Sequence, residues 1–275
     1  MTNFNKTMLA IPYIRSNFLG DELSEKMLYS LNVKEEAANL TNNINEANGG
    51  MFTRGVEVRS LYFETILNNY SKYFEQLVVL GIGLDTKYDK LECLADKDSY
   101  GIDIAKKDIE WIHSQSGYKT KVSLIEGDIN HIENVMEKLK AQGFDTTKRT
   151  FIIWEGGTYY LNPSQVFKVL SFFRNQMNLV GVTVDLINNE VIEDREHPNF
   201  NMINKVLDIL KNSGNQWKGF FDKQEMTHFL KDSLKYRVCE ILEYEKVEQE
   251  LYPKHTCVMM ENLMYFVVAT NLKKR

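Results

Sequence analysis

The chain has 275 residues, of which 43% are hydrophobic and 26% are charged, the proportions of an ordinary soluble globular protein. Its net charge of -5 provides no basic field of the kind that supplies most non-specific affinity for nucleic acids, so DNA and RNA are not expected partners. The three cysteines are scattered, without a CxxC spacing, and predict neither a disulfide framework nor a metal site. No signal-peptide pattern and no run of about 18 apolar residues occurs, so we expect a cytoplasmic protein that does not enter a membrane.

The first part of the chain, to about residue 75, has the pattern of a helical cap. In residues 25–40 and 58–74, apolar side chains recur at intervals of three and four residues, which predicts helices. Between them the segment NNINEANGG, residues 42–50, is polar and predicts a turn-rich break. No linker rich in Pro, Gly or Ser follows, so we expect one domain over residues 1–275.

From residue 76 the pattern changes to short β-branched runs that alternate with helical stretches. This alternation is typical of parallel βαβ units and predicts an α/β fold with a doubly wound sheet. Pro163, directly after Asn162, marks the expected start of one of the helices. The strands expected in this core, residues 76–187, are 76–83, 99–104, 121–129, 149–156 and 181–187.

The last part, residues 188–275, differs from this alternation. Residues 199–214 and 222–233 predict helices, and residues 236–247 and 263–271 predict two further strands. These two strands are expected to pair as a hairpin at one edge of the sheet, which then has seven strands.

The most informative motif is VVLGIGLDT, where an apolar strand leads into Gly81, Gly83 and Asp85. Glycines at a strand end allow positive φ and leave bare backbone against which a ligand can lie, so a cofactor is expected there. Asp103 follows the next strand, 22 positions after Gly81, where a carboxylate can accept hydrogen bonds from ribose hydroxyls. Asp128, one strand later, is placed to receive an adenine amino group. Alternatively, the glycines only form a tight turn and Asp128 only caps a helix.

Two cofactor classes share this arrangement. A dinucleotide site has a third glycine, in GxGxxG, where the helix meets the pyrophosphate, and here that position is Thr86. NAD is therefore disfavoured, although NAD-dependent oxidoreduction stays an alternative. The acidic residues after the second and third strands better suit a ligand with adenine, ribose and a charged amino-acid tail.

These motifs also carry a resemblance. LGIGLDT, residues 80–86, is similar to the loop LGAGxDT of the leucine carboxyl methyltransferase family, which includes bacterial small-molecule and polyketide O-methyltransferases. EGGTYYL, residues 155–161, is similar to the family's EGxxxYL. Arg59 in RSLYF matches a pattern like RxxFF, and Thr7 with Arg15 matches a threonine followed eight residues later by an arginine.

The resemblance implies a Rossmann-like class I methyltransferase fold with a helical N-terminal cap, a lid insertion after the fifth strand, and S-adenosylmethionine (SAM) as cofactor. Arg59 would pair with the SAM carboxylate, for which a guanidinium is geometrically suited. Gly81 and Gly83 would line the methionine portion, and Glu155 would lie near the cofactor's ammonium group and the acceptor. The full set of implied cofactor-binding residues is Thr7, Arg15, Arg59, Gly81, Gly83, Asp85, Asp103, Ile104, Asp128, Ile129 and Glu155.

The sequence departs from the family pattern at several positions. Ile82 replaces a small residue between the two glycines and is expected either to crowd the cofactor or to pack into the core. Asp89 and Lys90 replace an aromatic–arginine pair, Ala105 replaces a proline, and Trp111 replaces a lysine. These departures leave open a degenerate SAM-binding protein without catalytic activity.

The implied chemistry places few demands on side chains. SAM supplies an activated methyl group, so the protein chiefly aligns the reacting atoms and excludes water. We expect Glu155 and Tyr160 to be the catalytic residues; Tyr159 and Tyr160 alternate, so only one can face the pocket. Candidates for a base that activates a hydroxyl acceptor are Glu155, His197 and His255.

The acceptor is less well specified. Residues 188–205 are polar and predict either a lid over the acceptor or a solvated loop and helix, and Trp217, Phe220 and Phe221 form either an acceptor wall or core packing. The preferred function is SAM-dependent O-methylation of a carboxylate or hydroxyl on a small metabolite. The alternative is carboxyl methylation of a protein C-terminus.

Overall fold

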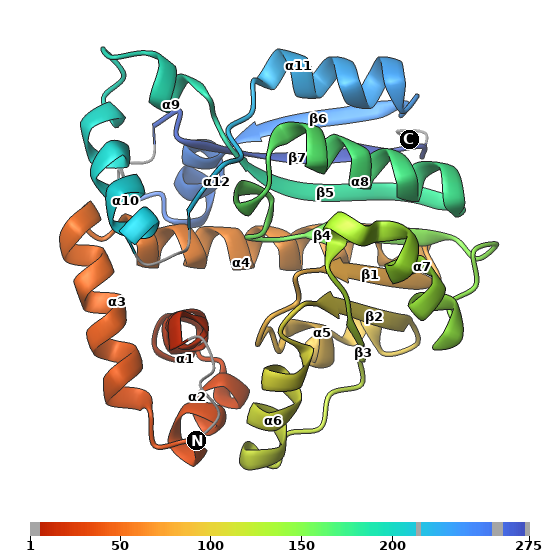
Figure 1. The fold of residues 1–275 in the computed structure, drawn as a ribbon, viewed down its shortest axis with the longest axis horizontal. Helices are drawn as coiled ribbons and strands as arrows, with labels where there is room; N and C mark the ends of the chain where they lie inside the picture. Colours follow the sequence, from red (N-terminus) through yellow and green to blue (C-terminus); the bar gives the residue numbers. More distant parts are fainter. Residues whose placement is uncertain (1–5, 213–215, 255–260, 273–275) are drawn as a thin grey trace. The chain divides into compact units, whose positions relative to one another are not determined.

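The structure, a computed structural model, describes residues 6–212, 216–254 and 261–272. Within these residues seven strands form one sheet in the order β3-β2-β1-β4-β5-β7-β6 (Figure 1). β2 and β3 are parallel, as are β4 and β5, whereas β7 is antiparallel to both of its neighbours. The strands are β1 (Gln76–Leu80), β2 (Asp98–Asp103), β3 (Ser123–Glu126), β4 (Thr150–Trp154), β5 (Leu179–Ile187), β6 (Val238–Glu243) and β7 (Met264–Thr270).

The chain divides into two compact units, and the first comprises residues 1–72 and 78–144. It begins with the predicted helical cap, in which α1 contacts α2, α3 and α4 (red to orange in Figure 1). Leu9, Leu28 and Ala37 form a buried apolar cluster within this cap. The cap helices are α1 (Ala10–Phe18), α2 (Glu22–Ser30), α3 (Lys34–Asn48) and α4 (Met51–Tyr70).

The predicted break at residues 42–50 is wrong. Helix α3 continues to Asn48 and ends only at Gly49, whose φ of 65° is left-handed. Asn45 is part of the reason, because its side chain pairs with the next helix: its amide donates to the hydroxyl of Thr53, and its carbonyl accepts from the Thr53 N–H. The polar residues of this stretch thus join two helices rather than separate them by a long loop.

The other expectation for the cap also needs correction. Residues 25–40 do not form one helix, because the chain turns at Asn32, where φ is 53°. Asp21 begins the first of the two helices, accepting hydrogen bonds from the N–H groups of Leu23 and Ser24.

The remainder of the first unit alternates strands and helices as predicted. Helix α2 of the cap contacts α6. The helices of this part are α5 (Lys87–Lys90), α6 (Lys106–Ser116) and α7 (Ile132–Ala141).

The second unit comprises residues 73–77 and 145–275. Helix α8 begins at Pro163, as predicted, and Asn162 and Gln165 form a reciprocal capping box there. The expected hairpin of the last two strands is confirmed, since β6 pairs only with β7 and lies at the sheet edge. The helices of this unit are α8 (Pro163–Gln176), α9 (Glu190–Glu193), α10 (Phe200–Asn212), α11 (Lys223–His228) and α12 (Tyr244–Leu251).

Two boundaries in this unit differ from the prediction. Residues 244–247, expected to extend a strand, begin α12 instead. Residues 222–233 are helical, but the last turn, Phe229–Ser233, is a π-helix.

In the described part of the chain, no helix combines the length and the apolar character that crossing a membrane requires.

Candidate cofactor and acceptor site

The glycine loop after β1 has the conformation that its sequence predicts. Gly81 and Gly83 have φ values of 69° and 54°, in the left-handed region that favours glycine. A side-chain carbon built on either residue would meet nothing within 4 Å, so the loop presents bare backbone to open space. The Gly81 N–H donates to the carbonyl of Ile102 in β2, at 2.8 Å, which fixes the turn to the neighbouring strand.

Asp103 lies at the end of β2 and is held against this loop. Its Oδ2 accepts the N–H of Gly83 at 2.8 Å, and its Oδ1 accepts the N–H of Ala105 at 2.8 Å. Burial raises the pKa of Asp103, and the two N–H donors partly oppose that effect. Each carboxylate oxygen has a second acceptor position, so the oriented group can still receive ligand hydroxyls. Ile104, the next residue, is 71% exposed, so its apolar side chain is accessible to a ligand.

Asp128 lies after β3 and caps a helical turn. Its Oδ1 accepts the N–H and the side-chain amide of Asn130, both at 2.9 Å, and its Oδ2 lies 3.3 Å from Nδ1 of His131. The capping role considered for Asp128 is therefore real. The carboxylate and the following Ile129 are both half-buried, so a ligand can still reach them.

Asp85 is the centre of a buried charge cluster within the first unit. Arg15 from α1 donates to its Oδ2 at 2.6 Å and forms an ion pair with Oδ1, and the ammonium of Lys87 lies 2.8 Å away. The side chain of Asp85 is 7% exposed and that of Lys87 only 2%. Burial alone would raise the pKa of Asp85, but the charges of Arg15 and Lys87 hold it well below its usual value. The predicted residues Arg15 and Asp85 therefore bind each other, which fastens the cap to the glycine loop.

Thr86, the next residue of the motif, makes a second link to the cap. Its hydroxyl donates to Oδ2 of Asp21, the residue that begins α2. Lys90 pairs with the same Asp21 oxygen at 3.1 Å. Burial opposes ionisation, but these partners and the cap N–H of Ser24 leave the pKa of Asp21 below its usual value. Thr86 stands at the position of the third glycine of a dinucleotide site. Through its hydrogen bond to Asp21, it connects the glycine loop to helix α2.

The departures from the family pattern have partners in the structure. Asp89 holds the loop between α6 and β3, accepting hydrogen bonds from the hydroxyls of Tyr118 and Thr120 and from the N–H of Lys121. Ile82 is buried and points into the core. Of the two interpretations of Ile82, packing into the core is confirmed.

Two further predicted residues belong to the cap. Arg59 lies on α4 and is buried, next to Ser60, whose hydroxyl accepts a hydrogen bond from Nε of Arg15 at 3.3 Å. Thr7 lies in a 3-10 turn before α1, and its side chain is outside the described residues.

In the second unit, Glu155 follows β4 directly and is half-buried. Gly156 has a φ of 70°, and its N–H donates to Oδ1 of Asp185 in β5 at 2.7 Å. The hydroxyl of Thr158 donates to the backbone carbonyl of Asp185 at 2.6 Å. Sequence reasoning missed Asp185, although a single carboxylate inside the apolar run LVGVTVDLI is a visible signal.

Tyr159 and Tyr160 occupy a 3-10 turn and not the strand across which they were expected to alternate. Tyr159 is nevertheless buried, as expected for one of the two, whereas Tyr160 is 44% exposed. The Tyr159 ring lies 4.8 Å from that of Trp217, centre to centre, with 50° between their planes. The N–H groups of Lys218 and Gly219 donate to the Tyr159 carbonyl at 2.7 and 3.1 Å. Residues 217–219 therefore lie against the turn that carries Tyr160.

The other aromatic candidates have different environments. Phe221 is fully buried and its ring lies near that of Phe167, so it belongs to the core. Phe220 is half-buried. Of the three residues expected in an acceptor wall, Trp217 is the one beside the Tyr159–Tyr160 turn.

His197 is poorly suited to act as a base. It is buried, and its Nδ1 accepts the N–H of Asn199 at 3.1 Å. The neutral ring then carries its proton on Nε2, which has no hydrogen-bond partner among the described residues. This nitrogen, Nε2, is thus a hydrogen-bond donor and cannot accept a proton from an acceptor hydroxyl. His255, the other histidine considered, lies outside the described residues.

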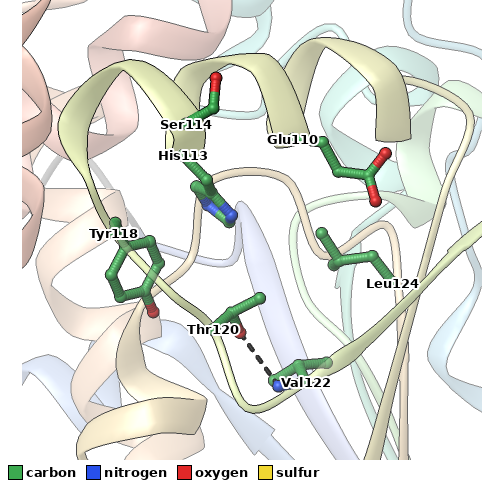
Figure 2. Close-up of a pocket in the computed structure, with 7 residues that line it drawn as sticks. All are labelled: Glu110, His113, Ser114, Tyr118, Thr120, Val122 and Leu124. Atoms are coloured by element: carbon green, nitrogen blue, oxygen red, sulfur yellow. Dashed lines mark hydrogen bonds between the residues drawn. The ribbon is translucent and has the colours of Figure 1, made fainter.

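An open cavity of about 330 Å³ lies elsewhere in the first unit. Figure 2 shows that its walls come from α6 and from the segment that leads into β3. None of the predicted site residues lines it, so it is separate from the glycine loop. Its lining residues are Glu110, His113, Ser114, Tyr118, Thr120, Val122 and Leu124.

Comparison with known proteins supports the fold and the motifs. Residues 11–174, more than half of the chain, match the model of the family described as leucine carboxyl methyltransferase. Comparison with the sequences of curated proteins gave no significant match.

Solved structures similar to this chain share its fold at low identity. A Streptomyces avermitilis protein of the DUF574 family has a TM-score of 0.64 at 9% identity, over 86% of this chain and 90% of its own. A Thermobifida fusca protein assigned as a methyltransferase has a TM-score of 0.63 at 14% identity, over 85% and 87%. The plantazolicin methyltransferase BamL, solved with a triazolic desmethylPZN analog and SAH, has a TM-score of 0.54 at 11% identity, over 91% and 97%. The predicted seven-stranded methyltransferase fold is confirmed.

Proposed function

The chain belongs to the leucine carboxyl methyltransferase family and is a SAM-dependent methyltransferase, and we propose that it methylates an oxygen atom of a small molecule. The observation that carries the proposal is the oriented Asp103 carboxylate beside the bare Gly81–Gly83 loop. Hydrogen-bond acceptors next to unobstructed backbone suit an adenosine with an amino-acid tail. The small-molecule acceptor is in keeping with BamL, whose solved complex holds a desmethylPZN analog.

The described residues fit such a cofactor. Asp103 would accept the ribose hydroxyls, and the exposed Ile104 with Ile129 would contact the adenine, whose amino group Asp128 would receive. Gly81 and Gly83 would face the methionine portion. The remaining polar ends of the cofactor would meet Arg59, for the carboxylate, and Glu155, for the ammonium group.

Arg15 and Asp85 act less directly in this proposal. Their ion pair, with Lys87, occupies both oxygens of Asp85, so these two side chains serve the cofactor by holding α1 against the glycine loop. Thr86 and Asp21 do the same for α2. The cap is thereby attached at the loop that the cofactor needs.

When bound, SAM supplies a sulfonium that makes its methyl group an electrophile, so the protein need not activate it. The task of the chain's residues is to align the acceptor oxygen with that methyl group and to exclude water. The exposed Tyr160, five positions after Glu155, and Trp217 would position the acceptor. A carboxylate acceptor is already ionised at neutral pH, which suits a site where His197 is not free to act as a base.

The test of the proposal is calorimetric titration of the protein with SAM and, in parallel, with NAD. We expect SAM to bind and NAD not to bind; binding of NAD alone would overturn the proposal. Methyl transfer from SAM carrying a labelled methyl group is then measured with panels of small carboxylic acids, phenols and alcohols. Peptides with a free C-terminus test the alternative acceptor, and SAM binding without transfer to any of these would indicate a non-catalytic protein.

Two of the departures that favour a non-catalytic protein have another explanation. Ile82 packs into the core, and Asp89 holds the loop between α6 and β3. Both substitutions therefore serve packing, and neither removes a group from the bare face of the glycine loop.

A further inference from the structure

Strand β5 contains one carboxyl group, that of Asp185, among side chains that carry no charge. All nine residues of β5 are buried, and Asp185 is fully so. An ionisable group at such a place is costly unless fixed hydrogen bonds compensate for the lost water. The bonds that Asp185 makes are therefore expected to have a specific purpose.

Those bonds converge on the turn that follows β4. The Asp185 carboxylate accepts the N–H of Gly156 at 2.7 Å, and the backbone carbonyl of Asp185 accepts the Thr158 hydroxyl at 2.6 Å. Gly156 itself has a left-handed φ of 70°, a conformation that other residues rarely adopt. The peptide group that joins Glu155 to Gly156 is thus held in orientation by the Asp185 carboxyl group on the neighbouring strand.

The opposite side of the turn is also filled. A side-chain carbon on Gly157 would lie 2.6 Å from Nε1 of the fully buried Trp154. The turn is therefore packed against the Trp154 indole and hydrogen-bonded to β5, with Glu155 at its start. A small displacement of a group that contacts a ligand is enough to impair binding, so the support of this turn bears on any contact that Glu155 makes.

We propose that Asp185 is a positioning residue for Glu155 and thereby sets the affinity for the amino-acid end of SAM. The inference rests on the proposed contact between Glu155 and the cofactor's ammonium group. Asp185 itself is fully buried and acts through the Gly156 N–H. Loss of this bond should let the turn relax, so that Glu155 no longer meets the ammonium group.

The experiment compares two ligands by calorimetry. S-adenosylhomocysteine carries the amino-acid tail, whereas 5′-methylthioadenosine lacks it but keeps the adenosine. The variants are Glu155→Gln, Asp185→Leu, which matches the side chain in size but cannot accept a hydrogen bond, and Asp185→Asn, which keeps one acceptor oxygen. Thr183→Val is the matched control, because Thr183 is buried on the same face of β5 and its hydroxyl has no partner among the described residues.

We expect Glu155→Gln to weaken S-adenosylhomocysteine binding by about 10- to 100-fold, the loss of one hydrogen bond to a charged group. Asp185→Leu should weaken it by about 10-fold and Asp185→Asn by less, while 5′-methylthioadenosine binding stays within about twofold in each. The double variant Asp185→Leu with Glu155→Gln should bind no more weakly than Glu155→Gln alone, because the two act as a unit. Thr183→Val should bind both ligands as the wild type does.

Three results would overturn the proposal: wild-type affinity in Asp185→Leu, an equal loss for both ligands, or full additivity in the double variant. If Asp185→Leu does not fold, Asp185→Asn must itself show a selective loss of S-adenosylhomocysteine affinity, and an equal effect on both ligands, or no effect, counts against the inference. Failure of the wild type to bind S-adenosylhomocysteine would instead overturn the proposed function, so the two failures are distinguishable.

Discussion

A side-chain carbon on Gly101 would lie 2.6 Å from Cδ1 of Ile82, so the isoleucine occupies the space that the glycine leaves on β2. The two residues lie on neighbouring segments, one in the glycine loop and the other inside the second strand. Ile82, between the two loop glycines, thus fits because Gly101, 19 positions later, has no side chain. The space beside Gly81 and Gly83 stays open.

The first prediction is that a larger side chain at position 101 destabilises the fold and that a smaller one at position 82 partly restores it. We expect Gly101→Ala to lower the free energy of unfolding by about 1 to 3 kcal/mol, because the added methyl group collides with Ile82. Combining it with Ile82→Val should recover part of that loss, and Ile82→Val alone should leave SAM affinity unchanged. Denaturant unfolding and calorimetry measure both effects. Strict additivity of the two substitutions would show that the side chains do not compete for the same space.

The second prediction concerns the buried cluster around Asp85. Asp85→Asn removes the carboxylate that pairs with the buried Arg15 and Lys87, and we expect a loss of about 3 to 5 kcal/mol of unfolding free energy. Asp89→Asn, at a half-buried carboxylate four positions on, is the comparison and should cost less. Chemical denaturation decides between them, and equal losses would contradict a special role for the Asp85 cluster.

The same cluster predicts a dependence of stability on pH. The folded-state pKa values of Asp85 and Asp21 lie below the ordinary value of 3.8. A depressed pKa stabilises the folded state above the unfolded pKa, and this stability is lost as pH falls through the folded pKa. The wild type should therefore lose stability below about pH 4, and Asp85→Asn should lose less over that range. Thermal melting between pH 6 and pH 2 measures the difference, and parallel curves would argue against it.

The fourth prediction tests the ribose contact. Asp103→Asn keeps an oxygen that can accept the Gly83 N–H but removes the charge, and we expect SAM to bind about 10-fold more weakly. Asp98→Asn is the matched control, since Asp98 is exposed at the opposite end of the same strand and should leave affinity within about twofold. Calorimetric titration with SAM provides the comparison. An equal effect of the two substitutions would remove Asp103 from the site.

The fifth prediction separates the two neighbouring tyrosines. Tyr159→Ala should lower the free energy of unfolding by about 3 kcal/mol, because its buried ring packs against Trp217. Tyr160→Ala should change stability by less than about 1 kcal/mol, since Tyr160 is 44% exposed, but should raise the KM for the acceptor. Melting temperatures and initial rates with the identified acceptor measure these effects. Unchanged kinetics in Tyr160→Ala would exclude a contact with the acceptor.

Much of the fold could be predicted from local patterns. The apolar runs from residue 76 onward identified the strands because a buried parallel strand needs continuous apolar side chains. The glycines at positions 81 and 83 identified the turn because its backbone requires positive φ. The prediction of a break at residues 42–50 is wrong, because the polar side chain of Asn45, which suggests a loop, instead pairs with Thr53 of the next helix.

The sequence by itself determined the alternation of strands and helices in the core, residues 76–187, the glycine loop and the acidic residue that ends the second strand, because each depends on spacing within a few neighbouring residues. Tertiary structure decided which distant side chains meet. Arg15 and Asp85 are 70 positions apart and Gly156 and Asp185 are 29 apart, and nothing in local periodicity indicates either pair. The side chains of Arg15, Asp85 and Asp185 are buried, whereas Gly156 is half-buried. The packing that brings the distant segments together, and excludes water from them, thus decides which partners these side chains have.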